Sequence, residues 1–237
     1  YFFHGIDVPM VCIGHQYLFM HKDFGLPRDR YKGSHALDLF SKLTSAGASR
    51  LLALSFRDMP SDPKHNIVVV PPLLRKEVLE LHPREGRYVH GYMLNSGFSE
   101  EVIAWHERHP DVELRFFWDR WEEEKIKKVD DTLSFYLIDD VEFLKQMSGC
   151  HAYASTAGFE SICEAMFLGK PVMMVPSHIE QEINAFDASR SGAGFASDTF
   201  DLTRLVDFAE DFVPDPYFRD WVLSARDRIL YELENVR

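Results

Sequence analysis

The residues best suited to chemistry lie where a short strand turns into a helix. Ala152–Ala154 has the composition of a buried strand, and Ser155, Thr156 and the turn Ala157–Gly158 lead from it into a helical segment, Phe159–Leu168. Such a helix start directs backbone N–H groups and a partial positive charge toward the carboxyl edge of a sheet. The sequence therefore predicts an anion site that suits a phosphate group, although Gly and Ser also serve merely to turn and cap a chain.

Two carboxylates lie four residues apart on this predicted helix, at Glu160 and Glu164. Like charges at this spacing repel by about 0.2–0.5 kcal/mol, so helix stability alone disfavours the pair. Glu164 lies far enough from the helix start to accept hydrogen bonds from both hydroxyls of a ribose whose diphosphate is bound there. A solvated helix face is the alternative interpretation of Glu164. Glu160 would oppose a diphosphate unless it turned away.

Apolar runs alternate with amphipathic segments along the chain, which is typical of a parallel sheet covered by helices. The expected strands are Pro9–Ile13, Arg50–Ser55, Asn66–Val70, Tyr88–Leu94, Val112–Trp118, Leu133–Leu137, Ala152–Ala154 and Val172–Val175. The expected helices are Gly33–Ala46, Leu73–Leu81, Ser99–Arg108, Asp139–Met147, Phe159–Leu168 and a long amphipathic one, Pro216–Val236. The pattern predicts that Trp121–Val129 is a charged, exposed segment.

Composition narrows the class of protein. The 237 residues are 46% hydrophobic and 27% charged, as in a soluble globular protein. The net charge of −12 argues against a nucleic-acid partner, because phosphate contacts need a Lys/Arg surface. We find no apolar run of about 18 residues that would predict a membrane span. The three cysteines are widely spaced, which indicates neither a disulfide framework nor a zinc site and favours a reducing cytoplasm.

Three stretches together resemble the donor-nucleotide signature of GT-B glycosyltransferases: Gly158–Glu164, Gly169–Pro171 and Glu180–Ala185. The UDP-glycosyltransferase class shares this signature, as does the peptidoglycan lipid-intermediate N-acetylglucosaminyltransferase. Phe135–Asp140, "FYLIDD", is similar to the base-binding loop of the family. The likeness covers about Gly86–Ala196 well, whereas the earlier residues match only in strand order and in "IGHQ".

The resemblance implies a donor site. Glu164 would hold the ribose, while Gln181 and Glu180 would bind hydroxyls of the donor sugar. Ile138 would present its backbone to the uracil edge and Leu137 would pack on the ring, although core packing explains these two equally well. An ordinary polar helix start likewise explains Gln181. The implied donor-binding residues are Ser96, Leu137, Ile138, Ser155, Thr156, Ala157, Gly158, Phe159, Ser161, Glu164, Glu180, Gln181 and Asn184.

The family's chemistry, by this resemblance, is one displacement with inversion at the sugar carbon. A base takes the acceptor proton, and the helix start in place of a metal stabilises the leaving diphosphate. We therefore expect a nucleotide-sugar co-substrate, with no other cofactor and no metal. His15 and Gln16 match the edge of the acceptor cleft, although a lone histidine there is more often structural. We expect the base upstream of Tyr1, with His15 and His178 as fallback candidates.

The GT-B resemblance implies an α/β protein of two Rossmann-like domains, the first apparently truncated. We expect residues 1–75 to be the rear part of the N-terminal acceptor-side domain, 76–215 the nucleotide-sugar-binding domain, and 216–237 a helix packing back on the N-terminal part. Two alternatives remain, a sugar-nucleotide 2-epimerase of the same fold and a non-catalytic nucleotide-binding module. The acceptor could be a lipid-linked saccharide, a glycan or a small molecule. We expect no nucleic-acid partner and a cytoplasmic location, with peripheral contact to the inner face of the membrane as a further option.

Overall fold

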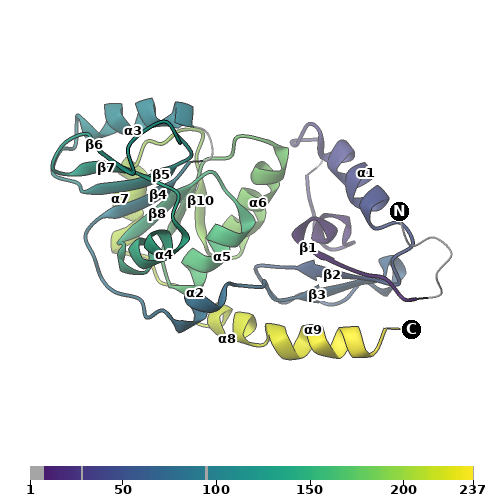
Figure 1. The fold of residues 1–237 in the computed structure, drawn as a ribbon. Helices are drawn as coiled ribbons and strands as arrows, with labels where there is room; N and C mark the ends of the chain where they lie inside the picture. The colour runs from purple at the N-terminus through teal and green to yellow at the C-terminus, as the bar shows by residue number, and fades with distance from the viewer. Residues whose placement is uncertain (1–7, 28, 94–95, 237) are drawn as a thin grey trace. The chain divides into compact units, whose positions relative to one another are not determined.

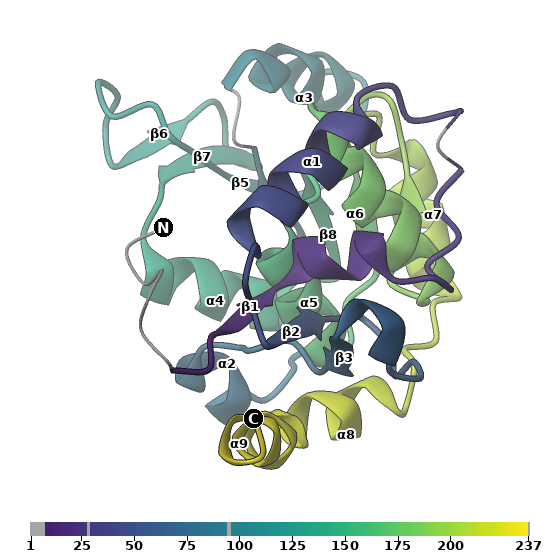
Figure 2. The same ribbon diagram turned by 90° about the vertical axis from the view of Figure 1, so that its right-hand side faces the viewer.

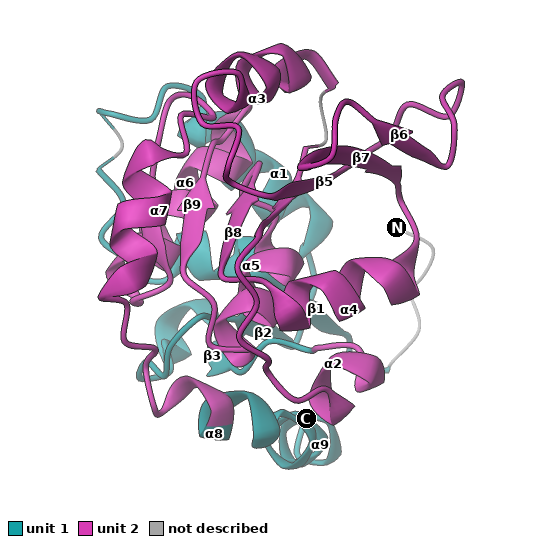
Figure 3. Ribbon diagram, turned by 90° about the vertical axis from the view of Figure 1, so that its left-hand side faces the viewer, with its two compact units in different colours: residues 1–73, 220–237 teal, residues 74–219 magenta. Residues whose placement is uncertain are grey.

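The computed structural model describes residues 8–27, 29–93 and 96–236. They form two compact units, residues 1–73 with 220–237 and residues 74–219 (Figure 3). Tyr1, upstream of which the catalytic base was expected, lies outside the described residues. In the described part of the chain, no helix is both long and apolar enough to cross a membrane.

The first unit contains a parallel sheet of three strands in the order β1-β2-β3. The strands are β1 (Val11–Gly14), β2 (Arg50–Leu54) and β3 (Ile67–Val70), with 3₁₀ helices at His15–Met20 and Pro63–His65. The helices of this unit are α1 (Ser34–Thr44) and α9 (Ala225–Glu234), drawn on opposite sides of the sheet (Figures 1 and 2). Leu52 and Val70 of the sheet pack with Ala225 and Ile229 of α9 in one of the buried apolar clusters of this unit.

The C-terminal segment is not one helix. The predicted helix Pro216–Val236 is divided into α8 (Phe218–Leu223) and α9, and Ser224 separates them. The hydroxyl of Ser224 donates to the carbonyl of Trp221 at 2.7 Å, so a side chain takes up a carbonyl at the end of α8. The apolar periodicity continues across the break, which explains why the sequence pattern predicted a continuous helix.

The second unit is built on a seven-stranded sheet in the order β10-β9-β8-β4-β5-β7-β6. Its strands are β4 (Val89–Tyr92), β5 (Leu114–Trp118), β6 (Ile126–Lys128), β7 (Leu133–Leu137), β8 (Ala152–Ser155), β9 (Val172–Met174) and β10 (Gly194–Ala196). Its helices are α2 (Lys76–Glu80), α3 (Ser99–His106), α4 (Asp140–Gly149), α5 (Phe159–Phe167), α6 (Ile179–Arg190) and α7 (Thr203–Glu210), with a 3₁₀ helix at Ser96–Phe98. The predicted α/β fold class is confirmed.

Alternating strand residues bury both faces of this sheet. On one face, Val102 and Trp105 of α3 and Leu205 of α7 join a core cluster with the strand residues. On the other face, Phe143 of α4 packs on His90 of β4 with a ring separation of 4.7 Å. Because helices cover both faces, the strand ends and the loops that follow them form the accessible edge.

One strand of the second unit departs from the parallel pattern. The segment Trp121–Val129, predicted only as charged and exposed, contains β6, which pairs antiparallel with β7 at the sheet edge. Its lysines and exposed isoleucine show no apolar alternation, so the residue pattern does not predict a strand here. A short, lysine-bearing edge strand of this kind protects a sheet from pairing with another chain.

Candidate functional site

The predicted anion site begins at the end of β8, on the carboxyl edge of the seven-stranded sheet. Ser155 is buried and lies in register with Tyr92 of β4 and Met174 of β9. Its hydroxyl oxygen accepts a hydrogen bond from the N–H of Ala157 at 3.2 Å. The N–H of Thr156 donates to the carbonyl of Tyr92 at 3.3 Å. The turn is therefore fixed by its own side chain and by the neighbouring strand.

Ala157 adopts a backbone conformation that residues with a side chain rarely take, with φ of +63°. A left-handed alanine costs roughly 1–2 kcal/mol. Its carbonyl oxygen accepts a 3.1 Å hydrogen bond from Nδ2 of Asn184, a buried residue of α6. Strained backbone persists only where its surroundings hold it. The structure thus places the predicted site residue Asn184 against the backbone of the turn, where it braces the turn.

Helix α5 starts directly after this turn, with Gly158 as its N-cap and the half-buried Phe159 as its first residue. The hydroxyl of Ser161 donates to the carbonyl of Gly158 at 3.2 Å. Gly158 has φ of −68°, which any residue adopts, and a Cβ there would meet only Oγ of Ser161, at 3.6 Å. Neither conformation nor packing requires glycine here, which favours a role in letting a ligand approach the backbone.

The carboxylate of Glu164 lies in the second turn of α5 and is 3% exposed. Nε of Arg75 donates to Oε1 at 2.7 Å, and Nη2 of the same guanidinium donates to Oε2 at 2.8 Å. This bidentate arrangement is the strongest form of arginine–carboxylate contact. The alternative of a solvated helix face is therefore wrong for Glu164. Arg75, which immediately precedes α2, was not among the residues predicted for the site.

Arg75 also reaches the start of α4, where its Nη1 lies 3.3 Å from Oδ1 of Asp140. Asp140 closely follows the predicted base-binding residues Leu137 and Ile138, which are half-buried at the end of β7 and just after it. One guanidinium thus contacts both the helix of Glu164 and the loop predicted to bind the base. The structure brings together two parts of the predicted nucleoside site that are distant in sequence.

Glu164 and Arg75 each influence the pKa of the other. Burial raises the pKa of Glu164, and the hydrogen bond and positive charge of Arg75 oppose that shift. The bond to Glu164 in turn raises the pKa of Arg75. A buried carboxylate remains ionised only when a partner compensates for its lost hydration. Arg75 supplies that compensation.

Helix α6 carries two predicted sugar-binding residues and one candidate base. Gln181 is buried, and its Oε1 accepts hydrogen bonds from N–H and Oγ of Ser177 at 2.9 and 2.8 Å. A sugar hydroxyl would therefore meet its Nε2 amide. Glu180 and His178 are exposed at the start of the helix, and Ser96 is half-buried in the 3₁₀ helix after β4.

The predicted acceptor-side residues, His15 and Gln16, belong to the other unit and follow β1. His15 is buried, and its Nδ1 lies 2.7 Å from the carbonyl oxygen of Leu54. Because a carbonyl only accepts, Nδ1 carries the proton and Nε2 is the basic nitrogen of the neutral ring. Gln16 is half-buried. The structure thus gives His15 both a structural bond and the tautomer that a general base needs.

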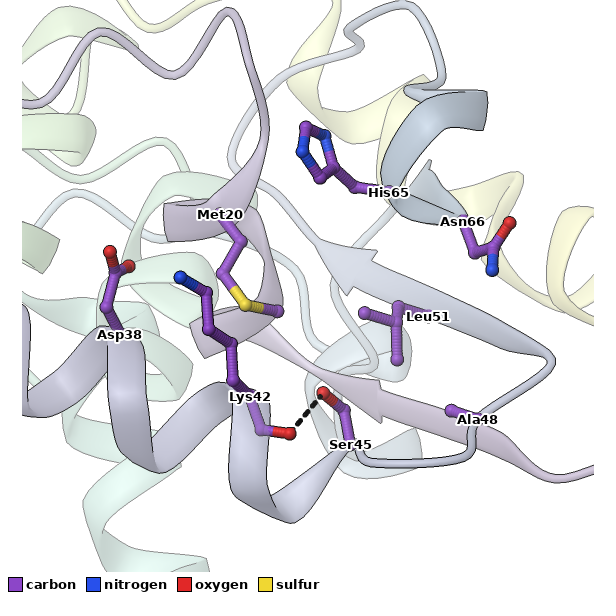
Figure 4. A pocket seen from close by; sticks show the side chains of 8 residues that line it. All are labelled: Met20, Asp38, Lys42, Ser45, Ala48, Leu51, His65 and Asn66. Carbon is purple, nitrogen blue, oxygen red and sulfur yellow. Dashed lines mark hydrogen bonds between the residues drawn. The ribbon is translucent and has the colours of Figure 1, made fainter.

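A cavity of about 380 Å³ lies in the first unit beside α1 (Figure 4). Its lining consists of Met20, Asp38, Lys42, Ser45, Ala48, Leu51, His65 and Asn66. Asn66 directly precedes β3, so the cavity adjoins the amino end of that strand, whereas His15 follows the carboxyl end of β1. The predicted site residues do not line it. Within the described residues, no group of three or more His, Cys, Asp or Glu side chains is arranged to hold a metal ion.

Residues 1–214 match the family described as glycosyl transferase family 1. The match covers most of the chain, and the chain belongs to this family. The resemblance to GT-B glycosyltransferases that the sequence motifs carry is confirmed by this match and by solved structures of the same fold. No curated protein matches the sequence.

Three solved glycosyltransferase structures illustrate the likeness of fold. The glycotransferase of kitacinnamycin is 19% identical, with a TM-score of 0.56 over 79% of this chain and 55% of its own. Spinosyn rhamnosyltransferase SpnG, complexed with thymidine diphosphate, is 15% identical, with a TM-score of 0.52 over 97% of this chain and 68% of its own. Glycosyltransferase VinC, in complex with DTDP, is 16% identical, with a TM-score of 0.50 over 99% and 64%. The chain thus spans between about half and two thirds of the length of these proteins.

Proposed function

We propose that this member of glycosyl transferase family 1 moves a sugar from a UDP-sugar to an acceptor hydroxyl, with inversion and without a metal ion. The observation that carries the proposal is the contact of Arg75 with both Glu164 and Asp140, beside the β8–α5 turn. Two strands separate β8 from β7 along the sheet edge. At about 4.8 Å between strands, the turn and the base loop lie roughly 14 Å apart, comparable with an extended nucleoside diphosphate.

Each part of the proposed site has one role. The N–H groups at the start of α5 hold the diphosphate and stabilise its charge as it leaves, as an oxyanion site does. Gly158 lets the phosphate approach the backbone. Glu164 accepts from the ribose, Leu137 and Ile138 contact the base, and Gln181 binds the donor sugar through its amide.

The reaction is a single displacement. A base removes the proton of the acceptor hydroxyl, whose oxygen forms a bond to the anomeric carbon as the bond to the diphosphate oxygen breaks. Of the two histidines considered for this role, His15 has its Nδ1 proton held by the carbonyl of Leu54, which makes the buried Nε2 the basic nitrogen of the neutral ring. His178 is exposed at the N-cap of α6. His15 is therefore our candidate of the two.

The ligands of two similar structures support a nucleoside-diphosphate donor, because SpnG and VinC were each solved with thymidine diphosphate. The nucleobase, the sugar and the acceptor of this chain are parts of the proposal. A lipid-linked saccharide, a glycan or a small molecule would serve as acceptor. We place the protein in the cytoplasm, with peripheral contact to the membrane if the acceptor is lipid-linked.

The test is to incubate full-length protein with UDP-, GDP- and dTDP-sugars, with and without a pool of saccharide and small-molecule acceptors. We expect UDP release that depends on acceptor and persists in EDTA. A new sugar nucleotide formed without acceptor would indicate a 2-epimerase instead. Binding without any turnover would indicate a nucleotide-binding module. Release only with dTDP-sugars would overturn the choice of uridine.

A further inference from the structure

Asp62 and His65 form a fixed pair beside the cavity of the first unit. Nδ1 of His65 lies 2.6 Å from Oδ2 of Asp62, which also accepts the backbone N–H of Lys22 at 3.0 Å. The backbone of Asp62 exchanges two hydrogen bonds with Ile67 of β3. The side chain of Asp62 is 1% exposed, whereas that of His65 is 44% exposed. The buried carboxylate therefore fixes the orientation of the imidazole ring.

This pair leaves one nitrogen of His65 for a ligand. Burial opposes the ionisation of Asp62, but hydrogen bonds from His65 and Lys22 lower its pKa to about 2. An ionised carboxylate only accepts, so Nδ1 carries a proton whether the ring is neutral or charged. The ring lines the cavity, and in the part of the chain that the structure describes its Nε2 has no hydrogen-bond partner. Nε2 is thus the ring atom that a molecule in the cavity would meet.

A second basic group lines the same cavity from α1. Lys42 is exposed, and its ammonium carries three N–H donors. Figure 4 shows Lys42 extending from α1 and His65 from the 3₁₀ helix Pro63–His65. The side-chain amide of Asn66 lines the cavity as well, from a left-handed backbone position with φ of +55° that asparagine tolerates better than most residues. Nitrogen donors therefore enter the cavity from two separate elements.

The cavity also has apolar lining and a size that suits a small molecule. Met20, Ala48 and Leu51 contribute the apolar surface. The volume of about 380 Å³ falls near the lower end of the range of ligand pockets, roughly 300–1,000 Å³. The hydroxyl of Ser45 donates to the carbonyl of Ser41 at 2.7 Å, so its proton is already used. These features fit a ligand with one polar group and a short apolar body.

The charge of this part of the chain favours an anion. Residues 1–73 contain eight Lys or Arg and six Asp but no Glu, whereas the whole chain has a net charge of −12. Asp38 also lines the cavity, but it is buried and has interactions of its own. The ammonium of Lys42 is the lining charge that attracts a ligand of opposite sign.

We propose that this cavity is a second ligand site, which binds a phosphate monoester between Nζ of Lys42 and Nε2 of His65. A phosphate suits the ring in either protonation state. Its monoanion has a hydroxyl that donates to a neutral Nε2, and its dianion accepts from a protonated one, since its second pKa is about 6. A carboxylate is ionised at neutral pH and only accepts, so it pairs with the charged ring alone.

This site is not the one proposed for sugar transfer. The cavity adjoins the amino end of β3, whereas His15 follows the carboxyl end of β1. The residues proposed to bind the donor or to act as base do not line it. Binding there is therefore expected to be independent of UDP.

A purely structural role for the pair predicts a different result. In that case the ring only fixes the loop before β3, and the cavity holds solvent. A residue that keeps the hydrogen bond to Asp62 would then replace histidine without consequence. His65→Asn is such a change, because its side-chain N–H takes the place of Nδ1–H while no atom replaces Nε2.

The experiment is calorimetric titration of full-length protein with butyl phosphate, with butyrate and with butanol, each with and without excess UDP. We expect saturable binding of butyl phosphate, unaffected by UDP, and no binding of butanol. Butyrate should bind at least about threefold more weakly. A hydrogen bond to a charged group is worth about tenfold in affinity, so His65→Asn and Lys42→Gln should each weaken the binding of butyl phosphate by about that factor.

The matched control is Lys64→Gln. Lys64 precedes His65 and is exposed, but it does not line the cavity. Its substitution removes the same charge as Lys42→Gln, and we expect the affinity for butyl phosphate to stay within about twofold. If His65→Asn unfolds at the assay temperature, the comparison of Lys42→Gln with Lys64→Gln decides the question, because both lysines are exposed.

Each outcome bears on a stated claim. No saturable binding of butyl phosphate, or equal weakening by Lys42→Gln and Lys64→Gln, overturns the site. Unchanged affinity in a folded His65→Asn gives the pair a structural role and overturns the contact with Nε2. Butyrate binding as tight as butyl phosphate overturns the choice of phosphate. Competition by UDP places butyl phosphate in the donor site and overturns the second site, whereas failure of UDP to bind contradicts the proposed function alone.

Discussion

Two buried carboxylates, one in each unit, have a half-exposed basic partner, yet their acidities shift in opposite directions. Asp62 is fully buried, and its Oδ2 lies 2.6 Å from Nδ1 of His65, whose side chain is 44% exposed. Burial at Asp62 is outweighed by hydrogen bonds, chiefly from His65, which lower its pKa to about 2. At Glu164 the effect of burial is the larger one, and it raises the pKa of that carboxyl although the two hydrogen bonds and the charge of Arg75 lower it.

The difference follows from where the hydrogen bonds come from. Oδ2 of Asp62 is held by His65, three residues later, and also accepts the backbone N–H of Lys22, 40 residues earlier in the sequence, at 3.0 Å. Glu164 is bound by a side chain that lies 89 residues earlier in the sequence. Its own helix uses its backbone N–H groups internally and cannot donate them to this carboxylate. At Asp62 a side chain and a backbone N–H together outweigh the effect of burial, whereas Glu164 has the side chain of Arg75 and is held at an energetic cost, as functional carboxylates are.

The largest expected effect is on folding, from Arg75→Ala. This change leaves the buried carboxylate of Glu164 without its counter-charge; because the Arg75 side chain is 37% exposed, we expect a loss of about 2–3 kcal/mol, below that for a fully buried pair. Urea unfolding at pH 7 measures the loss. The double variant Arg75→Ala/Glu164→Leu should recover part of that stability, because it also removes the uncompensated charge. A loss below about 1 kcal/mol in the single variant would contradict the pairing.

The next largest effect is expected on the affinity for UDP, which should depend on Glu164 but not on Asp62. Glu164→Gln removes the charge that strengthens two ribose contacts, so we expect UDP binding to weaken by about 1–3 kcal/mol. Asp62→Asn should leave UDP affinity within about twofold, although it disturbs its own loop. Calorimetric titration of both variants checks the contrast. Equal losses would mean that general destabilisation, and not a ribose contact, explains the effect of Glu164→Gln.

The fold was predictable where apolar patterning determines it. Leu133–Leu137 forms β7 with the expected bounds, because a buried parallel strand requires a compact apolar run. The exposed edge strand at Ile126–Lys128 has no such requirement, and pairing with one neighbour is enough to form it. At the break, the hydroxyl of Ser224 donates to the carbonyl of Trp221, and this residue leaves the helical periodicity of the sequence unchanged.

The site was predictable only where it is local in sequence. The turn and the start of α5 are visible as a strand followed by small polar residues and a helix. The partner of Glu164 was not predicted, because Arg75 lies in another segment and nothing in its own neighbourhood marks it. Helix α5 gave no such signal either, since Glu160, Ser161 and Glu164 share one polar side of it, opposite the apolar side. The burial of Glu164, and with it the need for a cation, therefore becomes visible only in the structure.

The pH dependence of folding should have opposite signs for the two carboxylates. The folded pKa of Asp62 is about 2, below its usual 3.8, so its stabilising contribution is complete above pH 3.8 and is lost as pH falls toward 2. The pKa of Glu164 is raised above its usual 4.5, so its contribution becomes less favourable as pH rises from 4.5 through the folded pKa. Urea unfolding across pH 2–8, compared with Asp62→Asn and Glu164→Gln, should show each slope disappear in its own variant.

At Gly158 we expect a smaller effect, in which a substitution lowers the affinity for UDP but hardly changes the free energy of unfolding. Alanine fits there without a clash and reduces the freedom of the unfolded chain, which offsets its poorer suitability as an N-cap, so Gly158→Ala should change the free energy of unfolding by less than about 1 kcal/mol. The added methyl group would hinder the approach of a diphosphate to the backbone, and we expect UDP affinity to fall severalfold. Thermal unfolding and titration of the same preparation measure the two. Unchanged affinity would show that the phosphate does not bind at this turn.

The smallest effect is expected at Glu160, on the same helix as Glu164 but exposed. Glu160→Gln removes a negative charge beside the proposed diphosphate and spares the ribose contact, so UDP should bind equally well or up to about twofold more tightly. Because an exposed charge is screened by salt, any gain should be present at about 50 mM salt and disappear near 0.5 M. Titration at both salt concentrations, beside Glu164→Gln, checks this. Weakening equal to that of Glu164→Gln would mean that the charge of α5 as a whole, and not the carboxylate bound by Arg75, governs affinity.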